Sequence, residues 1–375
     1  MRGVRSSLAA VAVAAVTMLA VAGCGSSGGS SSGGGSGGGS TGASGAFDTQ
    51  FASLITQAKA EGTLTWYEGL SADGGTKYAA DFQKRFGIQV QVVFNATGPL
   101  QQRFESEEQA GRGTADVLSL PDSAAMTSVM QAGLAAPYTI AENSAYPAGY
   151  VLDVNGATAY PTARVQMAVA YNTQLVDSSA AAALKDWNGI LQPSLKGKLG
   201  LADATKIGSY YTTAYMWNTE SRFGDTFLTS LGNQKPVIYS GQTEEGQRLA
   251  AGEISAGVMV DQIAILNYSN GSPVAWTYPS PTPQTLEYST IVKSAPHPAA
   301  AKLFMEYTHD REGALVWAKA WGGYLGRPDL DKDLTFKFTT EPWYHAATDP
   351  YLLPAAATNA TTKASTLKSV TSHFK

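Results

Sequence analysis

Polar side chains suited to binding a small solute stand directly after apolar, strand-like runs of this chain. Glu68 follows the run Thr63–Tyr67, and Asp261 follows the run Ser255–Val260. In sheets of parallel strands, ligands bind where the carboxyl ends of the strands meet the N-termini of the following helices. The candidate ligand-binding residues are Glu68, Ser71, Thr97, Gly98, Asp122, Ser123, Asp203, Gly208, Ser209, Tyr210, Asp261 and Tyr278.

The candidates in the first part of the chain also have plainer alternative roles. Ser71 or Asp73 would cap the following helix, because short polar side chains accept hydrogen bonds from free helix amides. Gly98 would let the backbone approach a ligand closely. For Asp122 and Ser123, helix capping and ligand contact are both open, and one residue could serve both.

The richest candidate segment is Ala202–Tyr211, which follows a short strand-like run and opens an aromatic helix. The amides of Gly208 and Ser209 suit a phosphate, carboxylate or phosphonate, because a helix N-terminus carries partial positive charge. Tyr210 could stack on a ligand, bind a metal as phenolate, or pack in the core. For Tyr211 we expect packing.

The sequence lacks the motifs of common hydrolases and nucleotide-dependent enzymes. Outside the Gly/Ser-rich residues 25–45 it contains no G-x-S-x-G, and the chain contains no H-E-x-x-H and no Walker A loop. Nucleophilic catalysis also needs a base, and no histidine stands at the strand ends named above. The histidines, which show no metal-ligand spacing, are His297, His309, His345 and His373. We therefore expect neither an enzyme nor a cofactor, with an exported hydrolase as the alternative.

Length and composition predict a large folded body with two domains. Of 375 residues, 44% are hydrophobic and 15% are charged, which is enough apolar material for a large core. The net charge of −4 gives no reason to expect nucleic acid as a partner. The single cysteine, Cys24, excludes an internal disulfide.

The first residues predict export. Arg2 and Arg5 precede the apolar run Leu8–Val21, which is the layout of a signal peptide over residues 1–23 and is short for a spanning helix.

Cys24 predicts a lipid anchor. The segment Leu19–Cys24 ends in Ala-Gly-Cys and resembles a bacterial lipobox, which implies cleavage before Cys24 and lipid attachment to its sulfur. Residues 24–46, rich in glycine and serine, would then be a flexible tether. The alternative is an ordinary signal peptide with a cysteine nearby by chance.

From Phe47 onward, helix-like and strand-like segments alternate. Apolar residues recur at helical spacing over residues 51–58, and Gly62 ends that segment. Such alternation predicts an α/β fold with a largely parallel sheet. The expected strands include residues 63–67, 88–94, 115–120, 198–201 and 255–260, and the expected helices include residues 77–86 and 100–110.

Several segments, in order, carry a family resemblance. The chain resembles the extracellular solute-binding protein of an ABC importer, in the ferric-ion and phosphonate subgroup, with the type II periplasmic-binding-protein fold. The segments are Gly62–Tyr67, Phe82–Val90, Gln102–Glu107, Ala115–Val117, Ala170–Thr173, Leu195–Gly200, Leu249–Glu253, His297–Phe304 and Gly326–Asp329.

The resemblance implies two lobes that close on a solute, as in a Venus flytrap, with two hinge crossings. It further implies delivery of the solute to a membrane permease, and we expect a monomer on the outer face of the cytoplasmic membrane. The implied parts are residues 47–164 and 276–330 for lobe I and the hinge return, residues 165–275 for lobe II, and residues 331–375 as a C-terminal extension.

The sequence leaves several kinds of solute open. Ferric binders of this subgroup usually carry adjacent tyrosines after the strand that here ends at Val260, whereas this chain has Asp261-Gln262. If iron binds, Glu68, Tyr210 and Asp261 would supply hard oxygen ligands. An organic solute, phosphorylated, phosphonate-bearing or zwitterionic, is favoured instead. A solute sensor for a membrane receptor is a further alternative.

Overall fold

The computed structural model describes residues 41–206 and 208–374. The chain divides into two compact units, Met1–Thr41 and Gly42–Lys375, and apart from Thr41 the described residues all belong to the second unit. The predicted signal peptide, Cys24 and residues 24–40 of the predicted tether lie outside the described residues. Helix α1 (Thr41–Gln50) includes the last part of the predicted tether, so helical structure begins before Phe47.

Helices and strands alternate along the first part of the chain. Most boundaries lie within a few residues of those expected; α3 extends five residues further toward the N-terminus because Ser71 caps it, accepting a hydrogen bond from the Gly74 amide. The elements are α2 (Ala52–Glu61), β1 (Thr63–Glu68), α3 (Ala72–Phe86), β2 (Gln89–Phe94), α4 (Thr97–Gln109), β3 (Val117–Leu120), α5 (Ser123–Gln131), η1 (Ala141–Ala145) and β4 (Leu152–Val154).

A long strand leads into the second part. The elements are β5 (Ala157–Asn172), α6 (Ser178–Ala183), η2 (Trp187–Leu191), η3 (Pro193–Leu195), β6 (Leu199–Ala202), α7 (Gly208–Thr219), α8 (Gly224–Asn233), β7 (Val237–Tyr239), α9 (Gln242–Ala250), β8 (Ala256–Val260), α10 (Asp261–Ser269) and β9 (Val274–Thr277).

The chain then returns and ends in mixed short elements. They are β10 (Thr282–Ile291), α11 (Pro298–His309), α12 (Arg311–Trp321), β11 (Tyr324–Leu325), η4 (Pro328–Asp333), η5 (Lys337–Thr340), β12 (Pro350–Leu352), η6 (Ala355–Thr358) and α13 (Ala360–Ser372).

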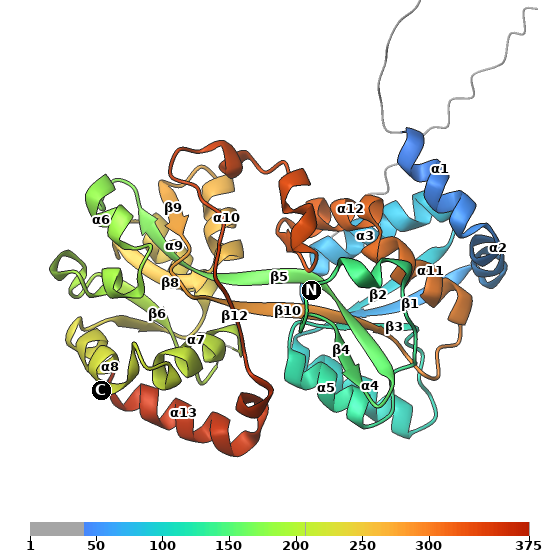
Figure 1. The fold of residues 1–375 in the computed structure, drawn as a ribbon, viewed down its shortest axis with the longest axis horizontal. Coiled ribbons are helices and arrows are strands. Elements are labelled where there is room, and N and C mark those ends of the chain that lie inside the picture. Colours follow the sequence, from blue (N-terminus) through green and yellow to red (C-terminus); the bar gives the residue numbers. More distant parts are fainter. Residues whose placement is uncertain (1–40, 207, 375) are drawn as a thin grey trace, which may run out of the picture. The chain divides into compact units, whose positions relative to one another are not determined.

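Two strands connect two half-sheets, as Figure 1 shows. The strand order is β2-β1-β3-β10-β5-β8-β6-β7. Strands β1, β2 and β3 are parallel in lobe I, and β6, β7 and β8 are parallel in lobe II. Strand β5 pairs with β10 from Tyr160 to Gln166 and with β8 from Met167 to Tyr171, so it passes from one lobe into the other.

Strand direction places the carboxyl ends of both half-sheets toward the crossing. Strand β10 runs from lobe II into lobe I, and β3 is antiparallel to it, so β1 and β3 end facing lobe II. Strand β8 is antiparallel to β5, so β6 and β8 end facing lobe I. The helices that follow these strands therefore begin beside the gap between the lobes.

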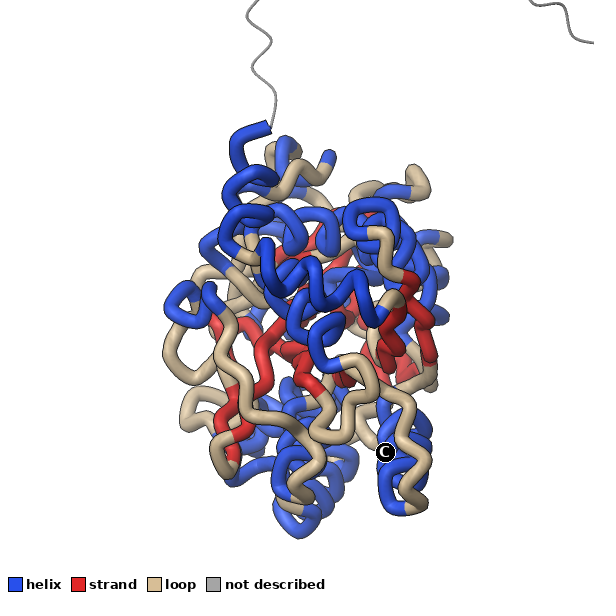
Figure 2. Tube along the Cα trace, turned by 90° about the vertical axis from the view of Figure 1, so that its right-hand side faces the viewer, coloured by secondary structure: helices blue, strands red, loops and turns tan. Residues whose placement is uncertain are grey.

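Helices cover the strands on both faces, which Figure 2 shows as strands enclosed between helices. In lobe I, one face packs Phe82, Phe304 and Trp317 in a first apolar cluster, and the other face packs Phe104 and Met126 in a separate cluster. The first cluster continues into lobe II through the residues near Trp276, so the two lobes share part of their core.

The C-terminal extension is folded and touches both lobes. Its Asp331 carboxylate lies 2.5 Å from the Arg164 guanidinium in lobe I. Its Trp343 ring packs 4.7 Å from the Trp276 ring in lobe II. Strand β12 then extends the sheet along β10. We call residues 328–352 the C-terminal strap. None of the described helices combines the length and the apolar character needed to cross a membrane.

Candidate functional site

A cavity of about 260 Å³ lies between the lobes, against the crossing strand β10. Lobe I contributes the start of α5, lobe II contributes α7, and the C-terminal region contributes β12, η6 and α13. Because its walls come from both lobes, the cavity depends on their relative position. Its polar lining residues are Asp122, Ser123, Thr127, Tyr211, Thr212, Gln284, Thr285, Tyr288, Thr358 and Lys363.

The start of α5 presents two of the predicted residues to this cavity. The Asp122 carboxylate caps the helix, accepting hydrogen bonds from the Ala124 and Ala125 amides at 2.8 and 3.0 Å. Ser123 follows at the first helical position. Among the residues that the structure describes, the Ser123 hydroxyl has no hydrogen-bond partner. Asp122 thus acts as the cap of α5, and Ser123 lines the cavity.

The other polar groups of the cavity differ in the interactions that they make within the protein. The Gln284 amide donates to Gln166 at 2.9 Å and accepts from the Tyr150 hydroxyl at 3.1 Å. The Tyr211 hydroxyl donates to the Ala357 carbonyl at 2.7 Å. Lys363 is the cation of the lining, and its ammonium lies 5.4 Å from the centre of the Tyr211 ring.

Helices α7, α9 and α10 begin close together in lobe II. The Gln242 side chain joins them, because its amide nitrogen donates to the Ser209 hydroxyl at 3.3 Å and its oxygen accepts from the Val260 amide at 2.7 Å. No side chain caps α9 or α10. Helix N-termini favour anions, so this end of lobe II favours a negatively charged group. Gly208 contributes the first helical residue of α7.

Gln242 was not among the residues expected from the sequence. It follows strand β7 at its carboxyl end, so the rule that selected the other candidates would also have selected it. That strand is only three residues long and its first two residues are exposed, which weakens the apolar signal.

Asp203 closes the turn after β6. Its carboxylate accepts from the Thr205 amide at 2.9 Å and from the Thr205 hydroxyl at 2.6 Å, and Lys206 lies 3.4 Å away. The hydrogen bond from the Thr205 hydroxyl is the main cause that lowers the pKa of Asp203.

Asp261 and Tyr278 are brought into contact by the fold. The buried Asp261 carboxylate accepts from the Gln166 amide and the Gln166 side chain, both at 3.2 Å, and from the Tyr278 hydroxyl at 3.1 Å. Burial raises the pKa of Asp261 to about 6. Burial also raises the pKa of Tyr278, whose hydroxyl lies 3.5 Å from that of Tyr324.

Glu68 is enclosed beneath the loop that follows β1. Its carboxylate accepts from the Leu70 and Ser71 amides at 2.8 and 2.9 Å. Complete burial raises the pKa of Glu68 to about 7. The neighbouring carboxyl is Glu287 on the crossing strand, which accepts from the Thr162 hydroxyl at 2.8 Å. Burial, followed by the charge of Glu68, raises the pKa of Glu287.

Of the ligand-binding residues predicted from the sequence, only Asp122 and Ser123 line this cavity, and all the others lie outside its lining. Tyr210 is 2% exposed and packs against Trp217 with ring centres 6.1 Å apart. Burial, and then the charge of Glu245, raises the pKa of Tyr210. Thr97 and Gly98 begin α4, which has no side-chain cap.

The three side chains named for iron, Glu68, Tyr210 and Asp261, have different neighbours. Glu68 lies beside Glu287, Tyr210 packs against Trp217, and Asp261 contacts Tyr278. Within residues 41–206 and 208–374, no group of three or more His, Cys, Asp or Glu side chains could hold a metal ion.

The comparisons with solved structures establish the fold. The structure is similar to iron-bound HitA from Pseudomonas aeruginosa, with a TM-score of 0.65 and 21% identity over 83% of this chain and 99% of that one. It is similar to AfuA from Actinobacillus pleuropneumoniae, with fructose-6-phosphate bound, at a TM-score of 0.62 and 17% identity over 83% and 98% of the two chains. The expected two-lobed type II periplasmic-binding-protein fold is therefore confirmed.

The sequence comparisons establish the family. A protein of Haemophilus influenzae described as uncharacterized is 31% identical over 140 residues, which span 36% of this chain and 40% of that relative. The family model of bacterial extracellular solute-binding proteins matches residues 77–342. This match covers lobe I from α3 onward, lobe II, and the strap as far as residue 342. The chain is a member of the bacterial extracellular solute-binding protein family, and so a solute-binding protein rather than an enzyme.

Proposed function

We propose that this chain captures a small organic solute with an anionic group in the cavity between its lobes, and delivers it to the permease of an ABC importer. The observation that carries this proposal is the composition of the cavity wall, which includes residues of both lobes, the crossing strand and α13. Such a cavity encloses a solute only when the lobes are close together, which couples capture to hinge closure.

Charge favours an anionic group on the solute. The two charged side chains that line the cavity are Asp122 and Lys363. The Asp122 carboxylate already accepts two amide hydrogen bonds of α5, whereas Lys363 makes no ion pair among the described residues. The hydroxyls of Ser123 and Thr212 suit a phosphorylated, phosphonate-bearing or zwitterionic molecule.

Ferric iron is the second candidate. The observation in its favour is the oxygen-rich group formed by Asp261, Tyr278, Tyr324 and Tyr344, in which the last two hydroxyls lie 2.6 Å apart. HitA, to which this chain is similar, is described with iron bound. Burial raises the pKa of each of these tyrosines, which disfavours the phenolate that iron needs.

A thermal-shift screen tests the proposal. The exported chain carrying Cys24→Ala, stripped of solute, would be screened against aminophosphonates, sugar phosphates, ferric citrate, polyamines and thiamine. A ligand at 100 times its Kd adds about 2.7 kcal/mol, or several degrees in Tm. We expect a shift with one class of organic anion. A shift with ferric citrate alone would favour the second candidate, and a shift with polyamines alone would contradict the anionic site.

We also propose that lipid on Cys24 anchors the chain to the outer face of the cytoplasmic membrane. Two or more acyl chains hold a protein stably, at about 0.8 kcal/mol per buried CH2. Cys24→Ala should therefore move the protein from the membrane fraction to the soluble extracellular fraction, as followed by immunoblotting. Retention of the variant in the membrane fraction would contradict the anchor.

Transport rather than sensing is the proposed outcome of capture. Deleting the chain should abolish uptake of the solute identified in the screen, and a permease and ATPase encoded beside it would agree with import. Undiminished uptake, with a receptor kinase encoded beside it, would favour the sensor alternative.

A further inference from the structure

A second and larger cavity, of about 540 Å³, has no assigned role. We call it the strap pocket. One wall is α10 of lobe II, the opposite wall is α12 of lobe I, and the C-terminal strap closes the third side. It shares no lining residue with the cavity between α5 and α7. Its volume falls within the range of about 300–1,000 Å³ typical of sites for small organic ligands.

The body of the strap pocket is apolar. Its side chains come from all three walls, and they are Ile265, Leu315, Ala318, Leu334, Phe336 and Phe338. The hydroxyl of Tyr268, the aromatic residue of the α10 wall, already donates to the Glu341 carboxylate at 2.5 Å. The interior therefore suits a hydrocarbon or an aromatic ring rather than a polar solute.

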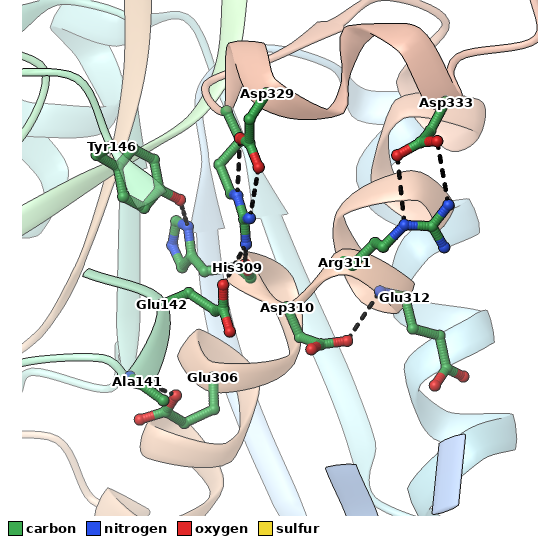
Figure 3. A network of polar contacts seen from close by, with 11 residues as sticks. Ala141, Glu142, Tyr146, Glu306, His309, Asp310, Arg311, Glu312, Asp329 and Asp333 are labelled. Atoms are coloured by element: carbon green, nitrogen blue, oxygen red, sulfur yellow. Dashed lines mark hydrogen bonds and ion pairs between the residues drawn. The ribbon is translucent and has the colours of Figure 1, made fainter. Parts of the chain in front are cut away.

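The rim of the pocket carries uncompensated positive charge. Lys319 on α12 and Lys337 on the strap both line it, and neither forms an ion pair within the described part of the chain. The one carboxylate in the lining is Asp333, which lies 3.2 Å from the Arg311 guanidinium and is thereby neutralised (Figure 3). An anionic group at this rim would meet two ammonium groups and no free carboxylate of the lining.

Ion pairs hold the strap wall in place. Arg327, just before the strap, donates to Glu142 at 2.9 Å, to Asp329 at 2.7 Å and to the His309 carbonyl at 2.8 Å. Figure 3 shows Asp329, Glu142 and His309 gathered on this side of lobe I. At the other end, the Phe338 ring packs 4.9 Å from that of Trp276 in lobe II. These contacts within the protein fix the strap wall of the pocket.

We propose that the strap pocket binds an apolar molecule that carries one carboxylate. Its hydrocarbon part lies between α10 and α12, and its carboxylate lies between Lys319 and Lys337. A molecule in this position touches both lobes and the strap, so it holds the lobes in their present relation. This inference does not depend on the solute of the first cavity.

Calorimetric titration with decanoate tests the proposal on the exported chain carrying Cys24→Ala. We expect saturable binding of decanoate and at least tenfold weaker binding of uncharged decanol. Lys319→Glu with Lys337→Glu should weaken decanoate binding at least tenfold. The control is Lys59→Glu with Lys84→Glu, two exposed lysines outside the pocket, which should leave the affinity unchanged.

A blocking variant locates the bound decanoate. Ser269 is exposed and lines the pocket, so Ser269→Trp should fill it without disturbing the core, and decanoate binding should be lost. The proposal would be overturned if the parent chain did not bind decanoate, or if it bound decanol equally well. It would also be overturned if decanoate bound with unchanged affinity both to Lys319→Glu with Lys337→Glu and to Ser269→Trp. Loss of decanoate binding in Ser123→Trp, with binding retained in Ser269→Trp, would place decanoate in the first cavity and also overturn it.

Discussion

Asp261 stands where strand ends predict a ligand-binding carboxylate, yet its two oxygens are engaged by the protein itself. The Asp261 carboxylate accepts hydrogen bonds from the Gln166 backbone amide, the Gln166 side-chain amide and the Tyr278 hydroxyl. From the sequence alone, a direct contact with solute is the simplest role for such a residue. The structure gives it a second role, because it ties the start of α10 to the crossing strand β5.

Asp261→Ala should therefore reduce stability as well as any solute affinity. Buried donors that lose their acceptor cost about 1–3 kcal/mol in unfolding free energy. Urea denaturation of the solute-free variant measures this loss. An unchanged unfolding free energy together with weakened solute binding would show that Asp261 acts on the solute alone.

Glu68 makes stability depend on pH in a defined direction. Its pKa rises from 4.5 in the unfolded chain to about 7 in the folded protein, so the folded state binds the proton more tightly. The stabilising contribution is complete below pH 4.5 and is lost as the pH rises toward 7. Asp261 shifts in the same direction, from 3.8 to about 6.

Glu68→Gln should remove this pH dependence while keeping an oxygen for the Leu70 and Ser71 amides. Between pH 5 and pH 8 the unfolding free energy of the parent chain should fall more steeply than that of the variant, as measured by urea denaturation. Asp153→Asn, at an exposed position on β4, is the control and should behave like the parent. Parallel curves for the parent and Glu68→Gln would contradict the assignment.

At the scale of elements, the segments with strong local signals were predicted well. Strand β1 and helix α2 agree with the sequence analysis because alternating apolar residues and the left-handed Gly62, at φ 75°, are local signals. Helix α11 begins at Pro298, and proline is favoured at the first helical position because its missing amide hydrogen is not needed there.

The strap could not be predicted in the same way. It consists of short 3-10 turns and a three-residue strand, whose positions are set by contacts with distant residues. Trp343, for example, lies between Tyr268 and Trp276 of lobe II, with ring centres 5.8 and 4.7 Å away. No local pattern in residues 331–352 specifies those partners.

Trp343→Ala should test how far the strap stabilises the body. Large-to-small changes of buried aromatic residues cost about 3–5 kcal/mol, and Trp343 is partly exposed, so we expect about 2–3 kcal/mol in unfolding free energy. Urea denaturation provides the measurement, and Trp343→Phe should retain most of the stability. A loss below about 0.5 kcal/mol would mean that the strap is held elsewhere.

At the scale of the whole molecule, the two-lobed fold followed from the family resemblance, whereas the residues of the proposed binding cavity could be predicted only in part. Asp122 and Ser123 were found because they follow β3 directly. Thr212 lies inside a helix, and Lys363 belongs to α13, which joins the cavity only through its packing on α7. Their part in the cavity depends on tertiary structure rather than on position after a strand.

The central claim is that the solute lies between the lobes, against the start of α5. Two serines of α5 provide a matched test, because Ser123 lines the cavity whereas Ser128 is exposed outside it. The measurement is a calorimetric titration of the solute found in the screen into Ser123→Trp and Ser128→Trp. We predict at least a hundredfold loss of affinity for Ser123→Trp and parental affinity for Ser128→Trp. Parental affinity in Ser123→Trp would place the solute elsewhere and contradict the account.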